Sequence, residues 1–527
     1  MTQRGGTGSP GREQLLWRFA PSVFGACAVV MILSLPLFPS QDGPVHLYYV
    51  DILRGVLTHA GPYAQHFEIK SYVTPYVVLY YSLLVLETVL PPLISEQLLV
   101  CGYVLTFILG FQYLVGALTD RPGPWPLVGA AFSLNFYLYM GFYSYSLATA
   151  LSLLLSGYWL RSAKHLTPRR IAALTFGYVL LLLCHPVPAA IFLAFCGLHI
   201  LVSFTYEYLA SPGQIQACWR SFRRPLSVVM VMGVAGAGFV SRFLASMPRA
   251  STAGTETSMR LLDNVGAELK LWSLSPLGSI AYRLVLLALI ASAGATLLIG
   301  LRRRREPIGA AAASVAGMAV VCLIARYATP VSLNNGGAFF QQRFSIYWVM
   351  FLFGFCSVLK PPRWFVNTIG VVALGCTATV LCFQWTYLSA TARNLNSALA
   401  EPLVAPGSLG VVVSETDYVR REAVGDPFLG GSAHFFRNSK AIMTSAAWMD
   451  GPLIMLRPKH EYPWTYASTS LASERILAAI SRTGAASVKL DLVILVNGEG
   501  PITRELIERL GFRTSNAGRQ VAFYYHP

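Results

Sequence analysis

Segments of about 20 predominantly apolar residues recur along most of this 527-residue chain, and they constrain its fold more than any motif does. A helix needs about 20 such residues to cross the hydrocarbon core of a bilayer, where each backbone polar group must be satisfied within the segment. We therefore expect a mainly α-helical, polytopic membrane protein. About eleven transmembrane helices are predicted, at 19–38, 95–117, 125–141, 143–160, 171–186, 188–208, 226–244, 281–300, 308–326, 343–359 and 365–387.

The composition excludes the main soluble alternatives. Charged residues make up only 12% of the chain, against roughly 25% in an average soluble domain. The net charge of +16 could indicate a nucleic-acid partner, but 26 basic and 12 acidic residues precede position 388, and 14 and 12 follow it. The basic excess thus belongs to the membrane part, where basic residues orient helices. Because the sequence has neither a phosphate-binding glycine loop nor an arginine-rich tract, no nucleic-acid partner is expected.

The basic loops predict how the chain crosses the membrane. A shorter apolar stretch at 74–90 carries Glu87, so it is either a twelfth crossing or a helix at the surface. If 74–90 does not cross and the N-terminus is cytoplasmic, every strongly basic loop lies on the cytoplasmic side, as the positive-inside rule requires. We therefore expect 39–94 to be one long exterior loop with surface helices. The short loops favour a bacterial inner membrane over the endoplasmic reticulum.

The composition changes after the last predicted crossing, and this change divides the chain into two expected domains. Residues 1–387 form the transmembrane domain, and 388–527 form a small α/β domain. In the latter, apolar and polar residues alternate, with strands expected at 409–414, 491–496 and 520–525 and helices at 471–482 and 501–511. Eleven crossings place this second domain outside the membrane, in the periplasm.

The first exterior loop begins PLFPSQDGPVHLYYVDIL, directly after a span, and it holds the strongest candidates for chemistry. Asp42 precedes Gly43-Pro44 and an amphipathic run, so it could simply cap a helix lying along the membrane surface. His46 follows four residues later, about 40° around such a helix, so both side chains point to nearly the same side. A carboxylate and an imidazole placed together could act as a proton acceptor and its partner.

The layout of the chain resembles the GT-C superfamily of polytopic glycosyltransferases, which includes the protein O-mannosyltransferases and the bacterial aminoarabinose transferases. The resemblance rests on an acid just after the first span, a surface helix, a second apolar helix that does not cross, and an exterior C-terminal α/β domain. It implies an enzyme that transfers a hexosyl or pentosyl group from a polyprenyl-phosphate carrier to an acceptor hydroxyl. The resemblance also implies that Asp42 is the catalytic base, and a single displacement would invert the anomeric carbon.

Four further residues are candidates for substrate binding. His185, in CHPVPA, resembles the histidine signal at the matching helix end of related transferases, although a polar helix end broken by Pro186 explains it equally well. Glu68, in QHFEIK, is another acid of the first loop, where acids are usually just solvated. Arg326 and Arg343 flank an exterior loop, and a guanidinium suits a phosphate ester, but arginines at a membrane boundary also snorkel to headgroups. Arg343, within QQRF, is the first choice for the carrier phosphate.

The sequence departs from the resemblance between the third and fourth crossings. Oligosaccharyltransferases of the superfamily carry an Asp-x-Asp-like motif there, whereas this chain has NFYLYMGFYSYSL, without a charged residue. Because a divalent cation needs several oxygen ligands, we expect neither a metal nor another cofactor. We interpret the aromatic residues here as an interfacial belt in preference to a sugar-binding surface. They are Phe136, Tyr137, Tyr139, Phe142, Tyr143 and Tyr145.

A transporter or flippase for a lipid-linked or small polar substrate has the same hydropathy and is the competing hypothesis. Transporters usually place ionisable residues at mid-membrane and often show internal repeats. In this sequence the spans carry almost no central charge, no repeat is visible, and the polar candidates gather at the outer boundary. These features favour the glycosyltransferase.

Overall fold

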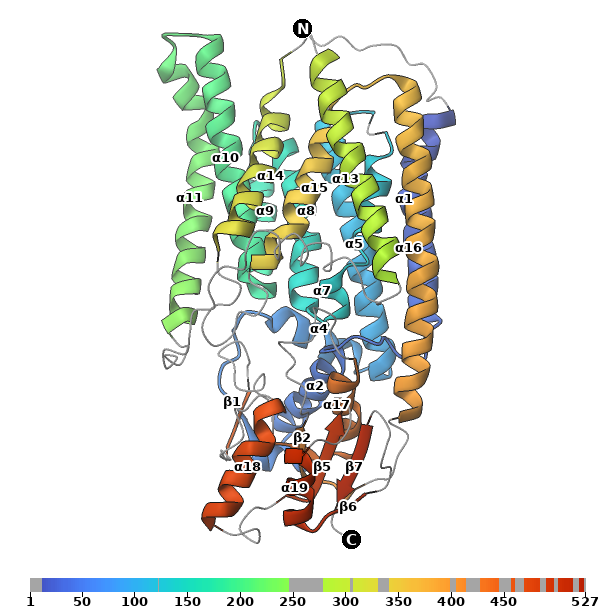
Figure 1. The fold of residues 1–527 in the computed structure, drawn as a ribbon. Coiled ribbons are helices and arrows are strands. Elements are labelled where there is room, and N and C mark those ends of the chain that lie inside the picture. The colour runs from blue at the N-terminus through green and yellow to red at the C-terminus, as the bar shows by residue number, and fades with distance from the viewer. Residues whose placement is uncertain are drawn as a thin grey trace.

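The protein is a long bundle of helices with a small β-sheet at one end, next to the C-terminus (Figure 1). This computed structural model describes residues 12–121, 123–245, 278–303, 307–329, 341–398, 404–413, 427–444, 456–459, 469–483, 490–496, 501–514 and 521–525. The long helices of the bundle are α1 (Arg12–Leu33), α5 (Pro92–Leu118), α8 (Tyr143–Ser162), α9 (Pro168–Cys184), α10 (Pro186–Ala210), α11 (Ile215–Ala245), α13 (Gly278–Arg303), α14 (Ala310–Ala328), α15 (Ser345–Cys356) and α16 (Arg363–Ala398).

The bundle confirms a polytopic α-helical membrane protein. Within the described ranges, six helices are long and apolar enough to cross a membrane, namely α1, α5, α10, α11, α14 and α16. Large apolar side chains on these helices point outward, among them Val30, Leu109 and Val234, each more than half exposed. An outer surface of this kind suits contact with lipid chains, because the bilayer core is as apolar as these side chains.

One predicted span, 125–141, is not a continuous helix. It is broken into α6 (Trp125–Ala131) and α7 (Phe136–Tyr139). The break has a local cause, because the side chain of Asn135 accepts the backbone N–H groups of Tyr137 and Leu138 at 3.0 and 3.3 Å. An asparagine that caps a new helix competes with continuation of the preceding one. The apolar composition of this stretch concealed that cap.

The segment predicted to be an exterior loop, 39–94, holds three helices and a strand. They are α2 (Gly43–Leu57), α3 (Tyr63–His66), β1 (Phe67–Ile69) and α4 (Val77–Leu86). Helix α4 covers the apolar stretch 74–90, and its 10 residues are only about 15 Å long. That length is about half the hydrocarbon thickness, so α4 is too short to cross.

Helix α2 forms where the apolar spacing predicted it, but the expectation that it lies on the membrane surface is wrong. Leu47 and Val50 are fully buried, as is Tyr48 on another face of the helix. The reason is a second helix, α17 (Pro427–Ser439), which packs against α2. Figure 1 accordingly draws α2 between the bundle and the C-terminal sheet.

Polar contacts hold the C-terminal part of the chain on α2. The hydroxyl group of Tyr48 donates to the carbonyl oxygen of Ala441 and accepts the backbone N–H of Met443, both at 3.0 Å. Asp51 forms an ion pair with Arg437 of α17, with 2.8 Å between the carboxylate oxygen and Nε. The predicted surface helix is therefore the structural link between the bundle and the sheet.

The C-terminal sheet has five strands in the order β3-β2-β5-β7-β6. They are β2 (Leu409–Val413), β3 (Ile442–Met443), β5 (Leu492–Val496), β6 (Arg513–Thr514) and β7 (Val521–Tyr525). Strand β2 is parallel to β3 and β5, and β7 is antiparallel to β5 and β6. Helices α18 (Thr469–Thr483) and α19 (Pro501–Leu510) supply part of its core, including Ile476 and Leu506. The predicted strands and helices are thus present, while α16 continues to Ala398, past the predicted boundary at 387.

Candidate active site

A turn between α1 and α2 carries Asp42 and is held against the loop that follows α7. The backbone N–H of Gln41 donates to the carbonyl oxygen of Tyr139 at 2.9 Å, and that of Asp42 donates to Met140 at 3.1 Å. Gly141 has a φ of +79°, and a Cβ at this position would lie 2.7 Å from the backbone nitrogen of Asp42. Only glycine fits so close an approach. The two segments therefore hold the Asp42 backbone in a defined position.

The carboxylate of Asp42 does not cap α2, although its sequence position allowed that role. The residue has helical backbone angles and makes no side-chain capping hydrogen bond. Instead, Ser40 Oγ accepts the backbone N–H of Gly43 at 3.1 Å, while Pro44 has no N–H to offer. One carboxylate oxygen of Asp42 accepts a hydrogen bond from Gln41 Nε2 at 3.0 Å. The carboxylate is thus available for chemistry.

Burial sets the proton affinity of Asp42. Loss of hydration raises its pKa from 3.8 to about 7, against the smaller effect of the hydrogen bond from Gln41, which lowers it. Burial disfavours the charged form of any acid. A general base works best when its pKa lies near the operating pH, and Asp42 meets that requirement at neutral pH.

His46 lies one helical turn beyond Asp42 and makes its hydrogen bonds elsewhere. Its Nε2 lies 2.9 Å from the carbonyl oxygen of Gly141, so this nitrogen carries the proton, and Nδ1 accepts the hydroxyl of Tyr80 at 3.2 Å. Burial lowers the pKa of His46 to about 4, so the ring is neutral at pH 7. These contacts connect α2, α4 and the loop after α7. The catalytic partnership of His46 with Asp42 stays a prediction.

His185 and Arg343, each predicted to bind substrate, lie together, and their role in binding stays a prediction. His185 caps α10, with its Nδ1 accepting the backbone N–H of Val187 at 3.1 Å. Its Nε2 contacts the Arg343 guanidinium and lies 3.2 Å from the hydroxyl of Tyr76. Tyr76 precedes α4 and has a φ of +74°, which is unusual for a bulky residue and marks a position fixed by its surroundings. No sequence pattern had pointed to Tyr76.

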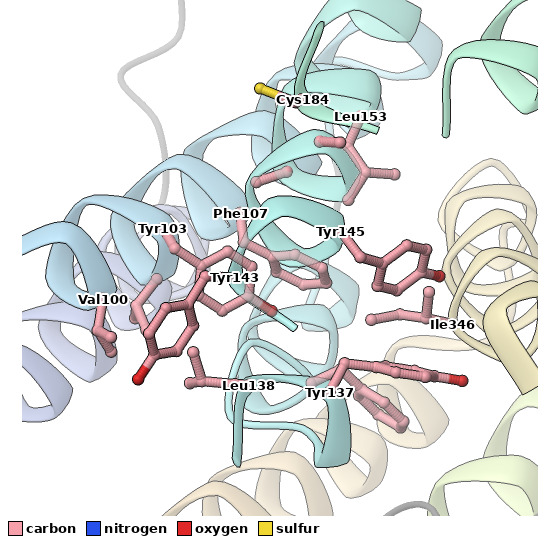
Figure 2. Close-up of a cluster of buried hydrophobic side chains, with 14 of the residues drawn as sticks. Val100, Tyr103, Phe107, Tyr137, Leu138, Tyr143, Tyr145, Leu153, Cys184 and Ile346 are labelled. Atoms are coloured by element: carbon pink, nitrogen blue, oxygen red, sulfur yellow. The ribbon is translucent and has the colours of Figure 1, made fainter. Parts of the chain in front are cut away.

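Most of the aromatic side chains at 136–145 are buried and two of them lie beside Arg343, so their interpretation as an interfacial belt is wrong. The guanidinium carbon of Arg343 lies 5.6 and 5.5 Å from the ring centroids of Phe142 and Tyr145. The hydroxyl groups of Tyr145 and Tyr137 donate to the carbonyl oxygens of Arg343 and Gln342. Both tyrosines are only 1% exposed and point from α7 and α8 toward α15 (Figure 2). A lipid-facing belt would instead leave its rings at the surface.

Arg326 lies in the last turn of α14 and is fully buried, which excludes snorkelling to lipid headgroups. Its Nε donates to Ser345 Oγ at 3.0 Å, and its guanidinium carbon lies 5.5 Å from the ring of Tyr327. Ser345 follows Arg343 by two residues, so both arginines belong to one end of the bundle. The loop predicted between them, 330–340, lies outside the described residues.

Glu68 has a different setting. It lies in β1, which pairs in antiparallel register with β4 (Leu456–Pro458), and its partner across the pair is Arg457. Glu68 therefore belongs to the junction between the first loop and the C-terminal part of the chain. Its predicted role in substrate binding stays a prediction.

Two structural features join the Asp42 turn to the arginine end. Helix α4 supplies Tyr80, which contacts His46, and Tyr76, one turn earlier, contacts His185. The loop after α7 likewise contacts Asp42 through its backbone and Arg343 through its rings. The arrangement thus combines a proton acceptor and a cationic group within one connected set of side chains.

Sequence reasoning missed Glu96, which lies near the start of α5. It is fully buried, and its Oε1 accepts the hydroxyl of Tyr143 at 2.6 Å. A Cβ on Gly43 would lie only 2.1 Å from that oxygen, so the carboxyl packs against the turn that carries Asp42. The available signal was a lone acid at the start of an apolar span, where ionisable groups are costly and usually have a role.

No group of three or more His, Cys, Asp and Glu side chains that could hold a metal occurs in the part of the chain that the structure describes. Metal-free chemistry remains a prediction.

Comparison with known proteins identifies the fold. No protein-family model and no curated protein sequence matches the chain. The crystal structure of ArnT from Cupriavidus metallidurans bound to undecaprenyl phosphate is similar, with a TM-score of 0.50 at 11% identity over 97% of each chain. Arabinofuranosyltransferase AftD from Mycobacteria gives a TM-score of 0.49 at 14% identity, over 96% of this chain and 41% of AftD. The match to ArnT extends over nearly the whole of both chains, and this protein has a GT-C fold, as the resemblance implied.

Proposed function

We propose that this protein is a membrane glycosyltransferase that moves a sugar from a polyprenyl-phosphate carrier to an acceptor hydroxyl, with Asp42 as the general base. The observation that carries the proposal is the state of Asp42, whose carboxylate caps nothing and has a pKa raised to about 7. It lies in the turn after the first helix of a GT-C fold. ArnT binds undecaprenyl phosphate, which supports a carrier of the same chemical class here.

The proposal includes eleven crossings, with 1–387 as the transmembrane domain and 388–527 as a periplasmic domain. Helices α5 and α8 pack side by side in the same direction, because Glu96 meets Tyr143 near their starts and Gly116 meets Arg161 near their ends. The segment between them must therefore return through the bundle, so α6 and α7 together count as one crossing. With the N-terminus in the cytoplasm, Asp42 and the C-terminal sheet then share the exterior face of a bacterial inner membrane.

The proposed reaction is a single displacement. Asp42 removes the proton of the acceptor hydroxyl, and the acceptor oxygen attacks the anomeric carbon as the bond from that carbon to the phosphate oxygen breaks. The electron pair of the broken bond stays on the polyprenyl phosphate, and the configuration at the anomeric carbon inverts. Arg343, with Arg326 behind it, stabilises the charge that develops on the leaving phosphate. His185 and Tyr76 orient the guanidinium of Arg343.

The test measures sugar transfer in membranes that contain the native chain, Asp42→Asn or Asp120→Asn. A pool of undecaprenyl-phosphate sugars is supplied, and donor loss and glycosylated lipid, glycan and protein products are followed by mass spectrometry. Loss of a general base typically lowers a rate by about 10²–10⁴-fold, and we expect that loss for Asp42→Asn. Asp120 is an exposed acid far from the candidate residues, before α6, so Asp120→Asn should retain native transfer.

Two outcomes would contradict the proposal. Undiminished transfer by Asp42→Asn, at equal abundance, removes Asp42 from the reaction. If the native protein consumes no donor, the transporter or flippase hypothesis becomes the better explanation, and uptake of the same lipid-linked sugars into vesicles would then be measured.

A further inference from the structure

The carboxyl of Glu96 takes no part in the proposed displacement, yet it is buried beside the turn that carries Asp42. Its Oε2 has no hydrogen-bond partner among the described residues. The charged groups that act on it from neighbouring elements are Arg437 of α17 and Glu87 after α4. Burying a carboxyl is costly unless its interactions offset the loss of water, so the position calls for a specific role.

A directed chain of hydrogen bonds leads from the Asp42 turn to Glu96. The backbone N–H of Gly43 donates to Ser40 Oγ at 3.1 Å, Ser40 Oγ lies 2.7 Å from the hydroxyl of Tyr143, and that hydroxyl donates to Glu96 Oε1 at 2.6 Å. Since the backbone N–H can only donate and Oε1 accepts, both hydroxyl hydrogens must point toward Glu96. Successive bonds in one direction polarise and strengthen one another.

The chain is packed against the backbone next to Asp42. A Cβ at Gly43 would lie 2.1 Å from Ser40 Oγ and 2.5 Å from the hydroxyl of Tyr143, in addition to its clash with Glu96. Every side chain larger than that of glycine is thus excluded at this position. The hydrogen bonds and the lack of a side chain at Gly43 together favour one conformation of the turn that carries Asp42.

We propose that Glu96 is a positioning residue, which acts through Tyr143 to keep Ser40 as the capping side chain of α2 and thereby leaves the Asp42 carboxylate free. The inference rests on the proposed function only for its effect on catalysis. Without the Glu96 acceptor, Tyr143 and Ser40 lose their fixed orientation and the turn relaxes. The Asp42 carboxylate, an equally good capping group, then accepts backbone N–H bonds and is held in its charged form.

The experiment follows the protonation of Asp42 without requiring transferase activity. The purified full-length protein is treated with dicyclohexylcarbodiimide, an apolar reagent that modifies protonated carboxyls, over a range of pH, and labelling of the Asp42 peptide is quantified by mass spectrometry. Native labelling should be half-maximal near the raised pKa of Asp42, which is about 7. Glu96→Leu and Tyr143→Phe should lower this midpoint by at least about one pH unit. Glu96→Gln, which keeps an acceptor oxygen for Tyr143, should retain the native midpoint.

Each result supports or overturns the proposal. Unchanged midpoints in both Glu96→Leu and Tyr143→Phe overturn it, and so does a Glu96→Gln midpoint as low as that of Glu96→Leu. Should Glu96→Leu fail to fold, as judged by gel filtration, Tyr143→Phe and Glu96→Gln decide alone. Where transfer is measurable, the variants with lowered midpoints should lose at least about tenfold, since small displacements of a catalytic group have large effects. A lowered midpoint without any native transfer supports Glu96 and contradicts the proposed function.

Discussion

Two aspartates, one directly before α2 and one within it, have opposite surroundings. Asp42, at the start of α2, takes part in no salt bridge within the described ranges, and its nearest polar partner is the amide of Gln41. Asp51 lies between two cations, 3.3 Å from the guanidinium of Arg54 and 2.8 Å from that of Arg437. Asp51, paired with two arginines, holds parts of the chain together, whereas Asp42, without a cation beside it, is the carboxylate that we propose as the general base.

The network around Asp51 extends to a third element. Arg54 also pairs with Glu87 at the end of α4, with 2.7 Å between nitrogen and oxygen, and the Glu87 side chain is fully buried. These ion pairs thus join α2, α4 and α17. Helix α4 also carries Tyr80, which contacts His46, and it directly follows Tyr76, which contacts His185. Along α2, the residue that holds elements together, Asp51, is separate from the proposed base, Asp42, although α4 lies near both.

The largest expected effect concerns pH. Because Asp42 must be deprotonated to act as a base, transfer should rise tenfold per pH unit up to its pKa of about 7 and then level off. Activity at pH 5 should be about 100-fold below the plateau. The measurement is kcat/KM for the lipid-linked sugar between pH 5 and 9. Asp51→Asn should keep the same pH profile. A shifted profile in that variant would contradict the separate roles of Asp42 and Asp51.

The second prediction removes a cation from Asp51. Arg437→Met should lower the free energy of unfolding by about 1–3 kcal/mol, because it leaves a partly buried carboxylate with one arginine only. Thermal unfolding of the purified protein measures the loss, and the double variant with Asp51→Asn should recover part of it. Transfer should stay within tenfold of native. Loss of transfer without loss of stability would show that Arg437 serves chemistry instead.

A smaller effect is expected from the hydroxyl that docks the C-terminal part. Tyr48→Phe removes the bonds to Ala441 and Met443 and should cost about 1–2 kcal/mol, since two buried backbone groups lose a partner. The same thermal unfolding measurement applies. The matched control is Tyr113→Phe, near the C-terminal end of α5 and away from the C-terminal part of the chain. Equal melting temperatures for Tyr48→Phe and the native protein would contradict this account of the docking.

The last prediction is a gain in stability. The pKa of Asp42 is raised by folding, so the native state holds a proton between about pH 4 and 7 that the unfolded state has released, and stability falls as pH rises through this window. Asp42→Asn should therefore melt a few degrees higher than the native protein at pH 8 and equally at pH 4. A higher melting temperature at pH 4 alone would reverse the sign and refute the assignment.

Sequence patterns were sufficient to locate a segment when its neighbours are close in the chain or are lipid. Long apolar runs located the bundle helices, and short apolar runs located strands such as Leu409–Val413 and Leu492–Val496. The acid after the first span made Asp42 a candidate base, and a histidine at a helix end made His185 a candidate for substrate binding; both roles stay predictions. These features depend on the residue and its immediate flanks, which a single sequence contains.

Features that depend on distant partners were not predictable. Helix α2 is buried by α17, which lies almost 400 positions later in the chain. The sequence of α2 alone does not predict that contact. Glu96 looked like one acid in an apolar run because its partners, Tyr143 and Ser40, approach only in the folded bundle. The rings around Arg343 looked like a belt for the same reason, since burial and interfacial exposure favour the same aromatic residues.

The contacts of α2 with the C-terminal part also have a consequence for biosynthesis. Tyr48 bonds to a residue 393 positions later, and Tyr49 accepts the backbone N–H of Leu456, 407 positions later. At roughly 5–20 residues per second, the ribosome reaches those partners on the order of 20–80 s after it has made α2. Helix α2 therefore exists for that time without these partners, and its contacts with the C-terminal part form only after residues 441–456 have been synthesised.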